Sequence, residues 1–294
     1  NSSIGVFLDK GSSYTGTVGN ISAGSNSIGI YGKNMVGGTI TQSGTTMNVG
    51  TNGVGIYGEG NGNINLSMGT ITLSDKNSIG VYAKGLNSVV TGNMGIGADT
   101  SIGIASEGNG NVTYTGAITI DDKGTGINDT ASVGIYKVDG TGTITTSVGN
   151  WSVGNSGYGI YLKGQGTTVN NSADMTLGMS AVGIFSSGVN VINNTGNIVV
   201  GETDVKGDHN KVEDHLNSVG IYGAGGTKIF NAAGATIKVH EDHSVGVYVD
   251  GSNAINGNET RFENHGIIDV DNGGVGVIVR NGAIAVNNGV ITLG

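Results

Sequence analysis

The chain contains neither cysteine nor proline, and charged residues make up only 12% of its 294 residues. The absence of cysteine excludes a disulfide framework and thiolate metal sites. The absence of proline, with glycines that keep no three-residue step, excludes a collagen-like triple helix. Lysine and arginine are scattered and the net charge is −9, so binding to nucleic acid or insertion at an anionic membrane surface is not expected.

Long apolar runs are also missing. No stretch of 18 apolar residues and no signal-peptide pattern occurs, which indicates either a cytosolic chain or a mature segment whose targeting ends lie elsewhere. Hydrophobic residues nevertheless reach 36%, mostly isoleucine and valine at regular intervals, and this argues against disorder. The composition, with 58 glycines, favours a narrow continuous core.

One short pattern organises the sequence. Ser78-Ile79-Gly80-Val81-Tyr82 recurs in related forms between Ile4 and Val277. The shortest step between central glycines is 23 residues, from Gly80 to Gly103, and the longest is 37, from Gly183 to Gly220. A period in this range indicates a solenoid, in which each repeat buries its apolar face against its neighbours. The central glycines are Gly5, Gly29, Gly55, Gly80, Gly103, Gly134, Gly159, Gly183, Gly220, Gly246 and Gly276.

The pattern alternates in the way of a strand buried on one face. We expect the two β-branched residues that flank the glycine, such as Val54 and Ile56, to face the core. The glycine and the following aromatic residue should share the outer face, so that the aromatic residues form a column beside a groove of glycines. The column comprises Tyr31, Tyr57, Tyr82, Tyr136, Tyr161, Tyr222 and Tyr248, with Phe7 and Phe185, and is interrupted at Ala105 and Ile278.

Two further short strands follow each pattern, as in Ile64-Asn65-Leu66 and Gly69-Thr70-Ile71-Thr72-Leu73. Three strands per repeat, joined by turns rich in glycine, asparagine and serine, predict an all-β fold: a parallel, right-handed β-helix of about eleven coils, roughly 50 Å long. Neither end carries a polar capping repeat, so we expect residues 1–294 to form a single section of a longer rod.

Three coils are longer than the rest, and we expect their inserts, near 121–131, 201–217 and 256–265, to lie at one corner. The insert at 201–217 is acidic and rich in histidine, and we expect it to lie over the same corner of the next coil. Such a surface favours a basic protein surface, with binding that depends on pH through histidine. The candidate partner-binding residues are Glu202, Asp204, Asp208, His209, Glu213, Asp214, His215, His240, Glu241, Asp242 and His243.

The same corner offers ligand types for a divalent cation, although no spacing matches a known metal motif. No metal or other cofactor is therefore predicted. Gly53-Val54-Gly55-Ile56-Tyr57-Gly58 fits the dinucleotide fingerprint only in its letters, because no helix follows it. Asp121-Asp122 is the only adjacent aspartate pair and falls in a turn, so no catalytic carboxylate pair is expected on a strand face and we predict no enzymatic activity.

These repeats resemble a known family. Repeated Ser-Val-Gly-Ile-Tyr, followed by asparagine-rich second strands and Gly-x-Ile-x-Val third strands, is similar to the passenger region of large Gram-negative type V autotransporter adhesins, most of all the fusobacterial type. The resemblance implies a secreted, cell-surface β-helix, anchored in the outer membrane by a C-terminal barrel elsewhere in the full chain. It implies attachment to a host or bacterial cell-surface protein or glycan, directly through corner loops or as a rigid stalk.

A polysaccharide-binding or polysaccharide-cleaving β-helix, a lyase or hydrolase, is the alternative function. In that case the tyrosines of the column would stack on sugar rings. The fold alone does not separate the two functions.

Overall fold

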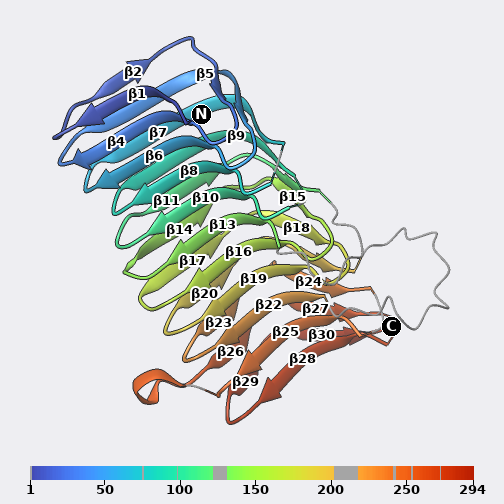
Figure 1. The fold of residues 1–294 in the computed structure, drawn as a ribbon. Helices are drawn as coiled ribbons and strands as arrows, with labels where there is room; N and C mark the ends of the chain where they lie inside the picture. Colours follow the sequence, from blue (N-terminus) through green and yellow to red (C-terminus); the bar gives the residue numbers. More distant parts are fainter. Residues whose placement is uncertain are drawn as a thin grey trace.

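A computed structural model describes residues 2–74, 76–97, 99–121, 131–201, 218–240, 243–252, 254–271 and 273–294. It confirms the predicted all-β solenoid, in which parallel strands stack coil upon coil (Figure 1). The described residues contain one short helical element, η1 (Ile255–Gly257), and no helix long and apolar enough to cross a membrane.

The recurring pattern forms one side of the solenoid, an eleven-stranded parallel sheet that we call sheet A. Neighbouring strands pair in register, so that Tyr31, Tyr57 and Tyr82 follow each other from coil to coil. The strands of sheet A are β1 (Ile4–Asp9), β4 (Ile28–Met35), β6 (Val54–Gly60), β8 (Ile79–Lys84), β10 (Ile102–Glu107), β13 (Val133–Val138), β16 (Tyr158–Lys163), β19 (Val182–Ser187), β22 (Val219–Ala224), β25 (Val245–Asp250) and β28 (Val275–Arg280).

The remaining strands form the other wall. In eight coils they are separate second and third strands, as predicted: β2 (Tyr14–Gly16) and β3 (Ile21–Ala23), β11 (Val112–Thr115) and β12 (Ile118–Ile120), β14 (Gly142–Thr146) and β15 (Asn150–Val153), β17 (Thr167–Asn171) and β18 (Asp174–Leu177), β20 (Val191–Asn194) and β21 (Ile198–Val200), β23 (Lys228–Asn231) and β24 (Thr236–Val239), β26 (Arg261–Asn264) and β27 (Ile267–Val270), β29 (Ile284–Asn287) and β30 (Val290–Leu293). In the second to fourth coils they merge into single strands, β5 (Thr39–Val49), β7 (Asn63–Leu73) and β9 (Asn87–Ile96).

The central glycines face the interior, so the predicted groove of glycines beside the tyrosines is wrong. A Cβ atom on Gly55 would lie 2.6 Å from the Gly80 carbonyl oxygen and 2.6 Å from Sδ of the buried Met47. Ile56 is also fully buried, whereas Val54 is only half-buried. Two consecutive residues of the pattern therefore point inward, and only the second of the two flanking β-branched residues belongs to the core throughout.

The glycine is required by this close approach. Along the solenoid each central glycine up to Gly246 faces the carbonyl oxygen of the next one, at 2.5 to 2.7 Å from the position that a Cβ atom would take. Any side chain would collide with the backbone of the next coil, which explains why the pattern keeps glycine while its other positions vary.

A ladder of asparagines, buried as far as Asn264, runs along the core in the C-terminal half. The Nδ2 atom of Asn171 donates to Oδ1 of Asn194 at 2.9 Å, and Asn194 donates to Asn231 at 3.0 Å. The ladder continues from Asn231 to Asn264 at 2.9 Å and from Asn264 to Asn287 at 2.8 Å. Each amide also donates to a carbonyl at the start of the third strand, as Asn194 does to Gly196 at 2.8 Å, so that it fixes the turn between the second and third strands.

The long coils do not all bulge at one corner, contrary to the prediction. Extra residues of the tenth coil lie between β25 and β26, the corner after the first strand, where Figure 1 shows η1. The inserts near 121–131 and 201–217 follow third strands β12 and β21, but residues 122–130 and 202–217 lie outside the described part of the chain. The extra residues of the tenth coil therefore leave the solenoid at a different corner from the ends of β12 and β21.

Candidate functional site

Only two of the eleven predicted partner-binding residues are described. His240 follows β24, and its Nδ1 atom lies 3.3 Å from Oδ2 of Asp271 on the next coil. Lys238 Nζ lies 3.6 Å from the same oxygen and 3.4 Å from Asp269. His243 holds a left-handed backbone conformation, with φ at 65°. The other nine, Glu202, Asp204, Asp208, His209, Glu213, Asp214, His215, Glu241 and Asp242, lie outside the described residues.

The described residues of this corner form ion pairs and no metal site. Within the described ranges, no group of three or more histidine, cysteine, aspartate or glutamate side chains is arranged to hold a metal ion. Asp121 is exposed at the end of β12, and Asp122 lies outside the described ranges.

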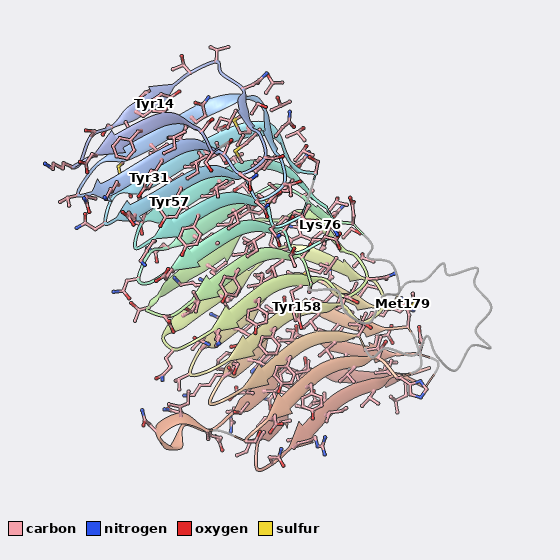
Figure 2. All side chains as sticks on the ribbon, viewed as in Figure 1. Tyr14, Tyr31, Tyr57, Lys76, Tyr158 and Met179 are labelled. Carbon is pink, nitrogen blue, oxygen red and sulfur yellow. The ribbon has the colours of Figure 1, made fainter. Side chains whose placement is uncertain are left out.

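The aromatic column is present on the outer face of sheet A, as predicted. Ala105 divides it into two blocks, the first formed by Phe7, Tyr31, Tyr57 and Tyr82. Figure 2 shows Tyr31 and Tyr57 one after the other along this face. The second block is formed by Tyr136, Tyr161, Phe185, Tyr222 and Tyr248, and its consecutive ring centroids lie 4.6 to 5.5 Å apart.

Most of these rings stack face to face. The rings of Tyr57 and Tyr82 are nearly parallel, with an interplanar angle of 3° and centroids 4.9 Å apart. The rings of Phe185 and Tyr222 have an interplanar angle of 4°. A ring so stacked has its face covered by its neighbour, and only edges and hydroxyl groups are left for a partner. Tyr31 differs, because its ring is turned 81° from that of Tyr57.

A row of charged residues accompanies the first block. Asp9 pairs in register with Lys33, and Glu59 with Lys84, which in turn pairs with Glu107. The charge therefore alternates in sign along these coils. Lys84 Nζ lies 3.1 Å from Oε1 of Glu107, and this contact is the one ion pair that the described residues of the row form.

The charged row borders an open groove of about 630 Å³. Three consecutive coils line it with a charged residue followed by glycine, and asparagines complete it. The lining residues are Asn34, Glu59, Gly60, Asn61, Lys84, Gly85, Glu107, Gly108 and Asn109. The tyrosine hydroxyls reach the same carboxylates: Tyr82 donates to Glu107 at 2.6 Å, and Tyr31 and Tyr57 donate to Glu59 at 3.4 and 3.5 Å.

The groove changes the acidity of its own groups. The hydrogen bond from Tyr82 and the contact with Lys84 hold the pKa of Glu107 below its ordinary value. Burial and, after it, the negative charge of Glu59 raise the pKa of Tyr31 and of Tyr57. Burial and the hydrogen bond to Glu107 raise the pKa of Tyr82 as well.

A buried lysine lies beneath one end of the groove. Lys137 of β13 is 1% exposed, and its Nζ donates to the carbonyl oxygens of Gly108 at 2.7 Å and Gly110 at 3.0 Å and to Oγ of Ser106 at 3.4 Å. Burial lowers its pKa from 10.5 to about 8. The ammonium group thus fixes the turn that carries Gly108 and Asn109 into the groove.

The sequence predicts no catalytic pair of carboxylates on a strand face. Glu59 and Glu107 are nevertheless two carboxylates at equivalent positions of sheet A. They stand two coils apart, which is about 10 Å between strands at the usual spacing. Proton donation in catalysis needs a carboxyl group with a raised pKa, and the pKa of Glu107 is lowered instead. Glu107 is engaged in a hydrogen bond with Tyr82 and in an ion pair with Lys84.

Sequence reasoning missed the groove because its residues are scattered along 76 positions, from Asn34 to Asn109. One signal was available: Glu59-Gly60-Asn61 and Glu107-Gly108-Asn109 occupy the same place after the repeated pattern. Aligning the repeats on their central glycines puts these two segments, with Lys84-Gly85 between them, side by side. Lys137 occupies a core position and had no signal of this kind.

Comparisons with known proteins add no identity: no family model, curated protein or solved structure matches this chain.

Proposed function

We propose that this chain is a section of a cell-surface adhesin: a rigid β-solenoid that is exported, held at the outer membrane by a barrel elsewhere in the full chain, and used for attachment to host cells or other bacteria. The observation that carries the proposal is the in-register stack of eleven coils, with an aromatic column and a charged row along one face. Such a rod holds contact groups at fixed intervals and at a distance from an anchor. The repeats resemble autotransporter passengers, and this supports the cellular setting.

Surface location is tested on intact cells that produce the full protein. Antibodies against the purified chain should label these cells, and protease added outside should remove the label while a cytosolic marker persists. Labelling that requires permeabilised cells would place the protein inside and contradict the proposal.

A polysaccharide-active β-helix is the second candidate, favoured by the groove with Glu59 and Glu107. We expect no cleavage, because the pKa of Glu107 is lowered, whereas a proton donor needs a raised one. Release of reducing ends from a panel of polysaccharides, lost in the double variant Glu59→Gln and Glu107→Gln, would establish the enzyme instead.

A further inference from the structure

Glu59 is the charge in the groove that lacks a cationic partner. Its two carboxylate oxygens accept only the hydroxyl groups of Tyr31, at 3.4 Å, and Tyr57, at 3.5 Å, and it forms no ion pair with any described residue. Both contacts are long for a hydrogen bond between oxygen atoms, and a carboxylate has about four acceptor positions. Glu59 thus retains accepting capacity on a side that faces the groove.

Glu107 provides the comparison within the same groove. Oε1 of Glu107 lies 3.1 Å from Nζ of Lys84, and Oε2 accepts a hydrogen bond from the hydroxyl group of Tyr82 at 2.6 Å. The charge of Glu107 is compensated inside the molecule, and the charge of Glu59 is left for a partner.

The hydroxyl groups next to Glu59 favour a cationic ligand. The oxygen atoms of Tyr31 and Tyr57 donate their hydrogens to Glu59 and keep lone pairs that can accept from an ammonium or guanidinium group. The net charge of −9 also steers positive groups toward the molecule.

We propose that the groove binds a cationic group, an ammonium or guanidinium such as a lysine or arginine side chain of a partner protein, on Glu59 beside the hydroxyl groups of Tyr31 and Tyr57. Asparagines at the groove edge, Asn34 and Asn61, offer hydrogen bonds to the backbone that carries the group. The inference does not depend on the adhesive role, because the site acts on any exposed basic segment.

Binding of a fluorescent lysine hexapeptide to the whole chain tests the site, with a glutamate hexapeptide and a neutral glucose hexasaccharide as comparison ligands. The lysine peptide should bind, and Glu59→Gln should weaken it about two- to fivefold, the worth of one exposed ion pair. Glu259→Gln is the matched control: this exposed residue lies far along the chain, and its change alters the net charge equally.

A second variant should act in the opposite direction. Lys84→Gln frees Glu107 and should strengthen binding of the lysine peptide, whereas Lys163→Gln, in the same row of sheet A but three coils away, should have less effect. This increase cannot come from a damaged fold, so it separates the site from misfolding.

Three results would overturn the proposal. They are equal binding of the lysine and glutamate peptides, equal losses in Glu59→Gln and Glu259→Gln, and binding of the neutral hexasaccharide that Glu59→Gln abolishes. The second would attribute binding to net charge alone, and the third would make the groove a carbohydrate site.

Discussion

The second to fifth coils and the last five coils differ in the core residue that lies between the second strand and the third. At the position where the second strand meets the third, the early coils carry Gln42, Leu66, Val90 and Tyr114, and the late coils carry Asn171, Asn194, Asn231, Asn264 and Asn287. These residues are in register along one column of the core. With apolar side chains there, the strand runs on through the corner in β7 and β9. Where the residue is asparagine, its side-chain amide donates to the carbonyl oxygen two to four residues later, and the second strand ends there.

The difference shows that one fold can be held by two kinds of core. Leu66, Val90 and Tyr114 stabilise the third to fifth coils mainly by burial, whereas Gln42 of the second coil donates to the carbonyl oxygens of Gly19 and Ser43. An asparagine ladder works only if every rung is present, because each buried amide depends on its neighbours for hydrogen bonds. Tyr114 and Trp151 are buried against each other near the change, with centroids 5.7 Å apart.

We expect the largest loss of stability when one asparagine of the ladder is replaced. Asn194→Val leaves Asn171 without its acceptor, Asn231 without its donor and the Gly196 carbonyl unpaired, a loss of about 4 kcal/mol. Val90→Asn makes the converse error, since it buries an amide between Leu66 and Tyr114, and should cost about 3 kcal/mol. Urea unfolding followed by the fluorescence of Trp151, the single tryptophan, measures both.

Asn193→Ala is the matched control. Asn193 precedes the rung and donates outside the core to Asn170 at 2.9 Å. Its removal should cost about 1 kcal/mol or less. Equal losses at Asn193 and Asn194 would mean that the ladder carries no special stability.

The glycine ladder should be equally sensitive in both regions, because it is the element that they share. Gly55→Ala and Gly220→Ala each place a Cβ atom 2.6 and 2.5 Å from a carbonyl oxygen of the next coil, and each should cost about 3 kcal/mol. Gly95→Ala has nothing within 4 Å of the new atom and should be nearly neutral. Circular dichroism melting curves compare the three, and harmless substitutions at both ladder positions would refute the close approach.

Much of this fold could be predicted from the sequence, because the repeat is local and its period survives variation in single residues. The strands of sheet A, the tyrosine column and its break at Ala105 follow from spacing alone. The inward direction of the central glycine could not be predicted in this way. Strict alternation would place Gly55 on the outer face, but in the structure Gly55 and the next residue, Ile56, both point toward the core. That irregularity depends on the approach of the next coil, which no single repeat contains.

The buried asparagines show a second limit. Asparagine in the second strands suggested turns, and the same residue type serves in surface turns and in the core. Asn193 and Asn194 are adjacent in sequence, yet one is half-buried on the outer side and the other is fully buried. Only the register of the neighbouring coils decides which of the two forms the ladder.

Lys137 should give a pH dependence of known sign. Its pKa is about 8 in the folded chain and near 10.5 in the unfolded one, so between these values the unfolded state binds more protons. Stability of the native chain relative to the Lys137→Met variant should therefore rise as the pH increases from 8 to 10.5. Paired urea titrations across this range measure the difference, and a falling difference would show that the ammonium is favoured by its surroundings.

The smallest effect concerns the break in the aromatic column. Ala105→Tyr would place a ring between Tyr82 and Tyr136 in register, but Ala105 is only 3% exposed, so the ring must displace the atoms that cover it and the net change should be about 1 kcal/mol or less. Ala105→Ser is the control without a ring. A melting temperature lower for tyrosine than for serine would show that the neighbouring rings cannot make room.

Attachment to cells tests the central claim most directly. Beads coated with the purified chain, with its Glu59→Gln variant or with an unrelated protein of similar net charge are counted on cultured epithelial cells and on bacterial layers. We predict that beads with the native chain attach in clear excess over the unrelated protein. Attachment no greater than that of the unrelated protein on every surface would contradict a directly adhesive role for this section. A smaller excess for Glu59→Gln would further assign the contact to the groove on sheet A.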